Sequence, residues 1–220
     1  MNDYPLQASR RILEPHDRIS EVLFGLIMVL TFTGSLSVAE AGREDIRTML
    51  IGALGCNIAW GIIDGVLYLM SSLADKSADL MTYQAIRRAG TAQAAHQLIA
   101  HALPPTVASV LQPAELEAIH KRLLQLPAPP SRAPLDLKDW LGAAAVFLLV
   151  FLSTFPVAIP FIVMHNTTLA LRISNAIAIV MLFIAGLAYG RSIGRSKLGF
   201  GISMVVLGGA LVALTMALGG

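Results

Sequence analysis

The chain alternates long apolar runs with shorter polar segments, and charged residues mark the ends of the runs. A helix needs about 20 mainly apolar residues to cross a bilayer. Five runs approach this length: the stretch between Glu21 and Glu40, residues 48–73, residues 140–164, a run ending at Arg191 that begins a little before Arg172, and Leu198 to the end of the sequence. The pattern therefore predicts an all-α polytopic membrane protein with five transmembrane helices.

Residues 76–137 follow a different pattern and predict a small helical cytoplasmic insertion between spans two and three. Residues 77–103 are rich in Ala and amphipathic, which favours a helix. The pair Pro104 and Pro105 ends it, and Pro113 starts another helix with Glu115 near its N-terminus. Residues 127–134 read PAPPSRAP, a stiff linker. The predicted organisation is a cytoplasmic N-terminal segment (1–18), spans one and two (19–75), the insertion with its linker (76–137) and spans three to five (138–220).

Composition supports the membrane assignment. Hydrophobic residues make up 55% and charged residues 14% of the chain, against about 45–50% and about 25% in soluble domains. A net charge of +2 is too small to indicate a nucleic-acid partner. Cys56 is the single cysteine, which excludes an intramolecular disulfide. The first 18 residues are polar, so we expect no removable signal peptide.

Lys and Arg residues predict the orientation, because they concentrate on the cytoplasmic side of membrane proteins. With five spans, 13 of the 16 Lys and Arg residues share one side with the N-terminus, and Arg43, Arg47 and Arg172 occupy the other. We expect a cytoplasmic N-terminus and an external C-terminus. The compact loops favour a bacterial inner (plasma) membrane.

The second predicted span carries an acid inside an apolar run, NIAWGIIDGVLYLMSSL. Its polar and glycine positions recur every three or four residues and share one helical face: Asn57, Gly61, Asp64, Tyr68, Ser71 and Asp75. A carboxylate at membrane depth is costly unless it is paired or protonated. We therefore expect Asp64 to bind a cation, a proton, or each in turn. The alternative is a structural Asp64, protonated or bonded to a neighbouring hydroxyl or backbone group.

Other residues are candidates for the same pathway. Met28 and Met70 offer thioethers to a soft or borderline metal, with ordinary packing as the alternative. Pro156 and Pro160 free backbone carbonyls, which either line a cavity or only shape the bundle. The candidate metal ligands in the spans are Asp64, Asn57, Met28 and Met70, and the candidate pathway residues are Asp64, Tyr68, Ser71, Pro156 and Pro160.

In the insertion, Glu117 and His120 have the Glu-x-x-His spacing of carboxylate-bridged metal bundles, although an exposed helix face explains one copy equally well. His96 and His101 are five residues apart, a poor spacing for chelation on one helix. The sequence has no Walker loop, Gly-x-Ser-x-Gly, His-Glu-x-x-His or cysteine pair. We therefore predict a protein that is not an enzyme and has no permanently bound cofactor.

Three segments resemble the vacuolar iron transporter family. FPVAIPF is similar to the end of that family's third span, ALRISNAIAIVMLFIAGLAYGRSIG to its fourth span and MVVLGGALVALTMALGG to its fifth. The order of five spans with a helical insertion is also similar. The resemblance implies a homodimer that moves ferrous iron, sometimes manganese, out of the cytosol in exchange for protons. It further implies a path lined by an Asp of the first span and a Met of the second, and an insertion rich in Glu ligands.

The sequence departs from that family at the expected path. Phe24-Gly25 stands where the family has Asp-Gly, and the only Asp-Gly here is Asp64-Gly65 in the second span. We infer that the acid has moved from one wall of the path to the other. The insertion has only Glu115 and Glu117, so we do not expect it to store several metal ions.

The leading hypothesis is a proton-coupled exporter of divalent cations, iron or manganese. Its expected partners are the lipid bilayer, a second copy of the chain, the transported cation and protons, without nucleic acid. Two alternatives stay open: a membrane scaffold or regulatory subunit without transport, and a transporter of a different solute.

Overall fold

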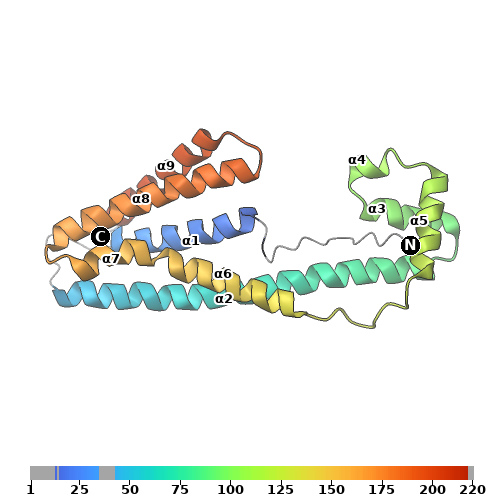
Figure 1. The fold of residues 1–220 in the computed structure, drawn as a ribbon, viewed down its shortest axis with the longest axis horizontal. Coiled ribbons are helices and arrows are strands. Elements are labelled where there is room, and N and C mark those ends of the chain that lie inside the picture. The colour runs from blue at the N-terminus through green and yellow to red at the C-terminus, as the bar shows by residue number, and fades with distance from the viewer. Residues whose placement is uncertain (1–12, 14, 35–42, 218–220) are drawn as a thin grey trace, which may run out of the picture. The chain divides into compact units, whose positions relative to one another are not determined.

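The computed structural model describes residue 13, residues 15–34 and residues 43–217. All regular secondary structure in this part of the chain is helical (Figure 1): α1 Pro15–Gly34, α2 Arg43–Arg88, α3 Ala92–Ala102, α4 Pro105–Ala108, α5 Pro113–Gln125, α6 Leu137–Ser153, α7 Phe155–Val163, α8 Thr167–Ser192 and α9 Lys197–Ala217. The predicted all-α class is confirmed. Most of the predicted N-terminal segment 1–18 and the ends of the first and last predicted spans lie outside the described residues.

The chain divides into two compact units. The membrane unit contains residues 1–68 and 137–220, and the insertion unit contains residues 69–136. The helix α2 contributes to both units, because it continues without a break from the second predicted span to Arg88. The insertion unit thus begins at Leu69, inside the run that we expected to span the membrane.

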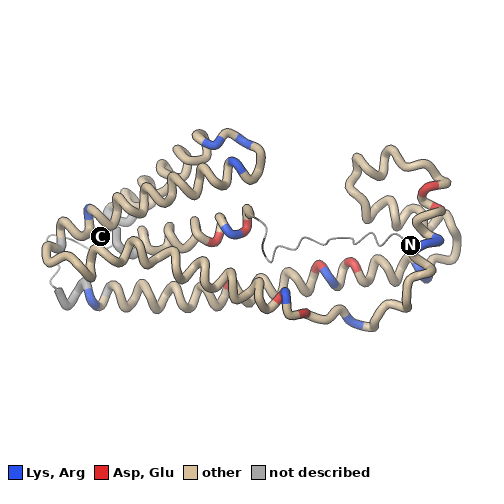
Figure 2. Tube along the Cα trace, viewed as in Figure 1, with Lys and Arg blue, Asp and Glu red and all other residues tan. Residues whose placement is uncertain are grey.

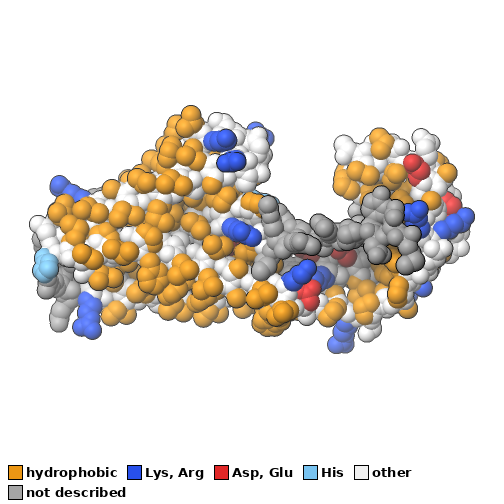
Figure 3. Space-filling model, in the orientation of Figure 1, with side chains coloured by type: hydrophobic (Ala, Val, Ile, Leu, Met, Phe, Trp, Pro, Cys, Tyr) orange, Lys and Arg blue, Asp and Glu red, His pale blue; other side chains and the backbone are white. Residues whose placement is uncertain are grey.

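Four segments in the described residues are long and apolar enough to cross a membrane: Leu50–Arg88, Leu137–Val163, Thr168–Ser192 and Lys197–Leu214. The protein is therefore an integral membrane protein. The first predicted span coincides with α1, and the residues that follow Gly34 are outside the described part. Figure 3 shows hydrophobic side chains over much of the visible face of the membrane unit, as expected for a surface in contact with lipid.

The core of the membrane unit lies where α1, α7, α8 and α9 meet. Leu26, Leu30, Val157 and Leu182 are fully buried there. Lipid tails are as apolar as these side chains, so close packing rather than water exclusion holds such helices together. Glycines permit that packing between α8 and α9, since a Cβ at Gly186 would lie 2.7 Å from the backbone oxygen of Phe200.

The run predicted as one span over 140–164 is two helices, α6 and α7, with a break at Thr154. Pro156 explains the break, because it has no N–H to donate and its ring clashes with the carbonyl one turn earlier. The hydroxyl of Ser174 on α8 donates a 2.7 Å hydrogen bond to the carbonyl of Val157. One backbone carbonyl near the break is thus hydrogen-bonded by a side chain of a neighbouring helix.

The insertion unit packs α3 and α5 against the end of α2. The single helix expected over 77–103 is wrong: α2 ends at Arg88, Gly90 lies in the bend, and the Thr91 side chain caps α3 by accepting a hydrogen bond from the N–H of Ala94. The breaks predicted at Pro104-Pro105 and at Pro113 are present. Apolar side chains fill the core between the helices: Ile86, Ala95, Ile99, Leu116, Ile119 and Leu123.

Candidate functional site

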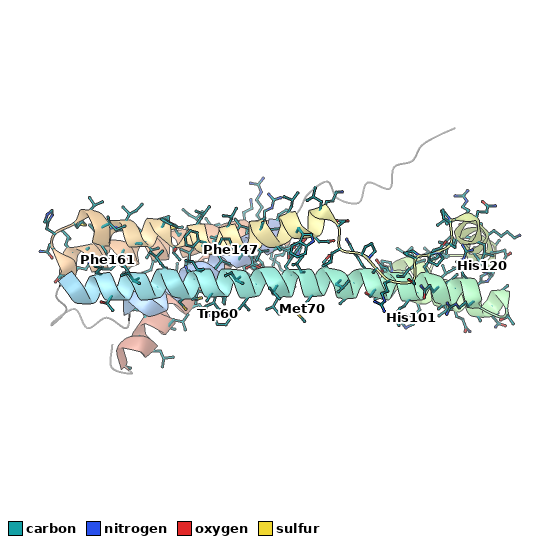
Figure 4. All side chains as sticks on the ribbon, turned by 90° about the horizontal axis from the view of Figure 1, so that it is seen from below. Trp60, Met70, His101, His120, Phe147 and Phe161 are labelled. Carbon is teal, nitrogen blue, oxygen red and sulfur yellow. The ribbon has the colours of Figure 1, made fainter. Side chains whose placement is uncertain are left out.

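The polar face of α2 meets α6 through glycines inside the membrane unit. A Cβ at Gly61 would lie 2.9 Å from the Phe147 ring, and one at Gly65 would lie 3.2 Å from the backbone oxygen of Ala143. The Tyr68 ring in turn packs against Gly142. Figure 4 shows α6, with Phe147, running alongside α2. The Gly-x-x-x-Gly of the sequence is therefore a close helix contact, and it lies beside Asp64.

Two polar side chains on this face have buried atoms without a hydrogen bond. Asn57 is 1% exposed, and neither its Oδ1 nor its Nδ2 has a partner among the described residues. The same holds for Oδ2 of Asp64, two turns further along α2. Most buried polar groups in folded proteins are paired, and an unpaired one costs about 1–3 kcal/mol. Asn57 and Asp64 therefore offer unused oxygen atoms on one helical face.

A second acid approaches from α1. Phe24 contacts Trp60 edge to face, with ring centroids 5.5 Å apart, and the Glu21 carboxylate lies within electrostatic range of Asp64. Glu21 is one turn before Phe24, and Asp64 is one turn after Trp60, as expected for helices that run in opposite directions. Glu21 was not predicted as a site residue, because in the sequence it only marks the end of an apolar run.

The other predicted pathway residues are spread over several elements. Met28 is half-buried and lies on the same face of α1 as Glu21, two turns away. Met70 is 61% exposed and Ser71 is exposed, and both belong to the insertion unit. Pro156 is half-buried and Pro160 is buried in α7. Met28 therefore lies about 10 Å along α1 from Glu21, at the level of Asn57 rather than of Asp64.

Two overlapping grooves in the membrane unit, of about 510 and 300 Å³, have a different character. Residues of α1, α6 and α8 line both of them, among them Val22, Leu149 and Met181. Neither groove includes Asp64 or Asn57. Their apolar walls suit hydrocarbon rather than an ion.

A separate cluster of ligand-type side chains lies in the insertion unit. The spacing on α5 places Glu117 and His120 on one face, and α3 supplies His96. His96 Nε2 is 3.0 Å from Glu117 Oε2. The imidazole rings of His96 and His120 have centroids 6.1 Å apart. One ligand atom of each residue lies within 4.8 Å of the others, and all three residues are half-buried. The structure thus adds His96 to the two ligands that the sequence predicted.

The Glu117 carboxylate is held in its charged form. Hydrogen bonds from His96 and then from Lys121, whose Nζ is 3.3 Å from Oε1, lower the pKa of Glu117 below its ordinary value. An ionised carboxylate is the form that ligates metal ions. His96 was not predicted as a ligand, because its spacing from His101 on the same helix is poor for chelation, whereas its partners come from α5.

Comparison with known protein families gives a match over the insertion and the last three predicted spans. The model of the VIT family matches residues 75–220, about two thirds of the chain. The matched range contains most of the insertion unit and all of α6 to α9. It begins after Asp64, so the departures at Phe24 and Asp64 lie before it. A search of curated proteins gave no match.

Proposed function

This chain belongs to the VIT family, the vacuolar iron transporter family, and we propose that it exports divalent cations, iron or manganese, from the cytosol in exchange for protons. Membership of this transporter family indicates metal-ion transport across a membrane rather than enzyme activity. One observation of the membrane unit supports Asp64 as the exchange site: its Oδ2 and both polar atoms of Asn57 are buried without hydrogen-bond partners among the described residues.

The chemistry of exchange follows from the position of the two acids. A carboxylate among apolar helices is stabilised by a bound cation or by a proton, and each excludes the other from the same oxygen. Glu21 is a second acid near Asp64 and, when ionised, would add a second negative charge. Like charges in an apolar region repel, so the pair favours a divalent cation when one is available and a proton when none is. Alternate occupancy would couple the two flows.

Neighbouring groups offer further ligands along the same face of α2. The Asn57 side chain offers a neutral amide oxygen two turns from Asp64. Carboxylate and carbonyl oxygens suit manganese, and a thioether from Met28 would favour a softer ion such as ferrous iron. We assign Asp64 and Glu21 to one ion position, and Asn57 with Met28 to a second position about 10 Å further along the path.

We further propose a homodimer in a bacterial inner membrane, with a cytoplasmic N-terminus. Figure 2 shows Lys and Arg at the start of α1 and at the α8–α9 turn, which lie at the same end of the membrane unit. Arg18, Arg191, Arg195 and Lys197 belong to these two segments. Concentrated Lys and Arg favour the cytoplasmic side, which supports this orientation.

Flux measurements on the purified protein in liposomes test the proposal. With an acidic lumen, we expect uptake of Fe²⁺ or Mn²⁺ that stops when a protonophore removes the pH gradient. A chain that moves no metal in either condition but retains a protein partner through purification would contradict transport and support the scaffold alternative. Flux of another solute without metal flux would contradict the choice of substrate.

A further inference from the structure

The cluster of His96, Glu117 and His120 has the donor chemistry of a transition-metal site. Imidazole nitrogens suit zinc, copper, nickel and iron, whereas magnesium and calcium prefer sites made of oxygen alone. Two histidines and one glutamate form the protein ligands of several catalytic zinc sites. A second carboxylate of the insertion, Glu115, is not part of the cluster: it accepts a hydrogen bond from the backbone N–H of Gln112 and caps α5.

The geometry requires only small side-chain movements. Metal–ligand bonds of about 2.0–2.2 Å in a tetrahedral site place neighbouring ligand atoms roughly 3.3–3.6 Å apart. The three ligand atoms here are within 4.8 Å of one another, and His96 and Glu117 are already 3.0 Å apart. Rotation about side-chain bonds changes such distances without moving α3 or α5. The two backbones are held by the apolar core that contains Ile99 and Ile119.

We propose that His96, Glu117 and His120 bind one exchangeable divalent transition-metal ion, with zinc preferred over magnesium and calcium. Three protein ligands leave a coordination position for water, which distinguishes such a site from the closed four-ligand sites that hold a fold together. The core between α3 and α5 already joins the helices without a metal. The ion is therefore exchangeable, and its binding does not depend on transport through Asp64.

The charges around the cluster set how strongly it binds. With neutral histidines, Glu117 carries the only formal charge of the three ligands, and the Lys121 ammonium lies 3.3 Å from its Oε1. A bound cation would replace the hydrogen bond from His96 and be repelled by Lys121. Lys121 is 70% exposed, so its effect is screened by solvent. Removal of this charge should strengthen metal binding slightly.

The test is a zinc titration of the full chain in detergent after chelation of bound metal, followed by calorimetry, with cobalt absorption as a spectroscopic check. We expect one strong zinc site per chain, in addition to any binding at Asp64, and it should survive an excess of magnesium. His96→Ala and His120→Ala should each weaken it by about tenfold or more, because even indirect support of a metal ligand is worth 10–100-fold. The control His101→Ala removes an exposed histidine of α3 that lies apart from His120 in Figure 4, and it should leave affinity unchanged.

Two further variants separate this site from misfolding and from the transport site. Glu117→Gln keeps the size and the hydrogen bond to His96 but removes the charge, so it should lose zinc while helix content stays at the parental level. Asp64→Asn should not change this zinc affinity. Lys121→Gln should increase it by about 1.5- to 5-fold, the range of an exposed ion pair. Parental zinc affinity in His96→Ala and Glu117→Gln, or an equal loss in His101→Ala, would overturn the proposal.

Discussion

At the scale of single residues, a contribution to stability does not explain why Asn57 is buried. It is 1% exposed, and both of its polar atoms have no partner among the described residues. Ser174 is equally enclosed, but its hydroxyl donates to the carbonyl of Val157. Under the proposed mechanism, Ser174 is a buried polar group that serves packing, whereas Asn57 is one that binds the transported ion.

We predict that Asn57→Leu stabilises the protein and impairs metal transport. Leucine is similar in size and removes an unpaired polar group, so the free energy of unfolding should rise by about 1–3 kcal/mol. Thermal unfolding in detergent and uptake into liposomes measure the two effects. The matched variant Ser174→Ala should lower stability, since it breaks a formed hydrogen bond. A less stable Asn57→Leu protein would mean that Asn57 supports its neighbours.

Some residues of the two candidate sites can be predicted from the sequence, and others cannot. Asp64 stands out because of the apolar run around it, and Glu117 and His120 because three residues separate neighbours on a helix. Glu21 and His96 do not stand out. Each acts with a residue of another helix, and the register between two packed helices is not encoded in the spacing of either one.

At the scale of elements, the contact between α2 and α6 positions Asp64. Gly61 and Gly65 bring the helices together because a side chain at either position would meet Phe147 or Ala143. Gly55 lies two turns before the contact region, and a Cβ there would have no atom within 4 Å. The same residue type on one helix thus has two different environments.

We predict that Gly61→Leu lowers stability by about 1–3 kcal/mol, the usual effect of forcing a side chain into a packed interface. Gly55→Leu is the matched control and should be neutral or slightly stabilising, because leucine favours a helix more than glycine does. Chemical or thermal unfolding of both variants gives the comparison. Equal losses at the two positions would show that the α2–α6 contact is not held by Gly61.

The boundaries of elements were harder to predict than their type. The apolar pattern correctly predicts helices, but an apolar run does not show where one helix ends and another begins. Pro156 is a visible signal for the break at Thr154, and Gly90 for the break between α2 and α3. Gly90 was predicted to lie within a helix, because Ala-rich sequence on both sides has strong helix propensity and glycine is tolerated there at a modest cost.

At the scale of the whole molecule, the proposed orientation makes a labelling prediction. Ser196 lies between α8 and α9 beside Arg195 and Lys197, whereas His165 lies between α7 and α8. In a Cys56→Ser background, a cysteine placed at residue 165 should react with an impermeant maleimide added outside intact cells. A cysteine placed at residue 196 should react only after the membrane is opened. The reverse pattern would contradict the proposed cytoplasmic N-terminus.

The central claim is that the Asp64 carboxylate carries the exchanged cation and proton. Its most direct measurement is metal uptake into acidic liposomes by Asp64→Asn, next to Asp79→Asn, which makes the same change at an exposed position of α2. Both proteins should incorporate equally and keep their helix content. We predict that Asp64→Asn loses metal uptake and that Asp79→Asn keeps it. Uptake of iron or manganese at the parental rate by Asp64→Asn would contradict the account.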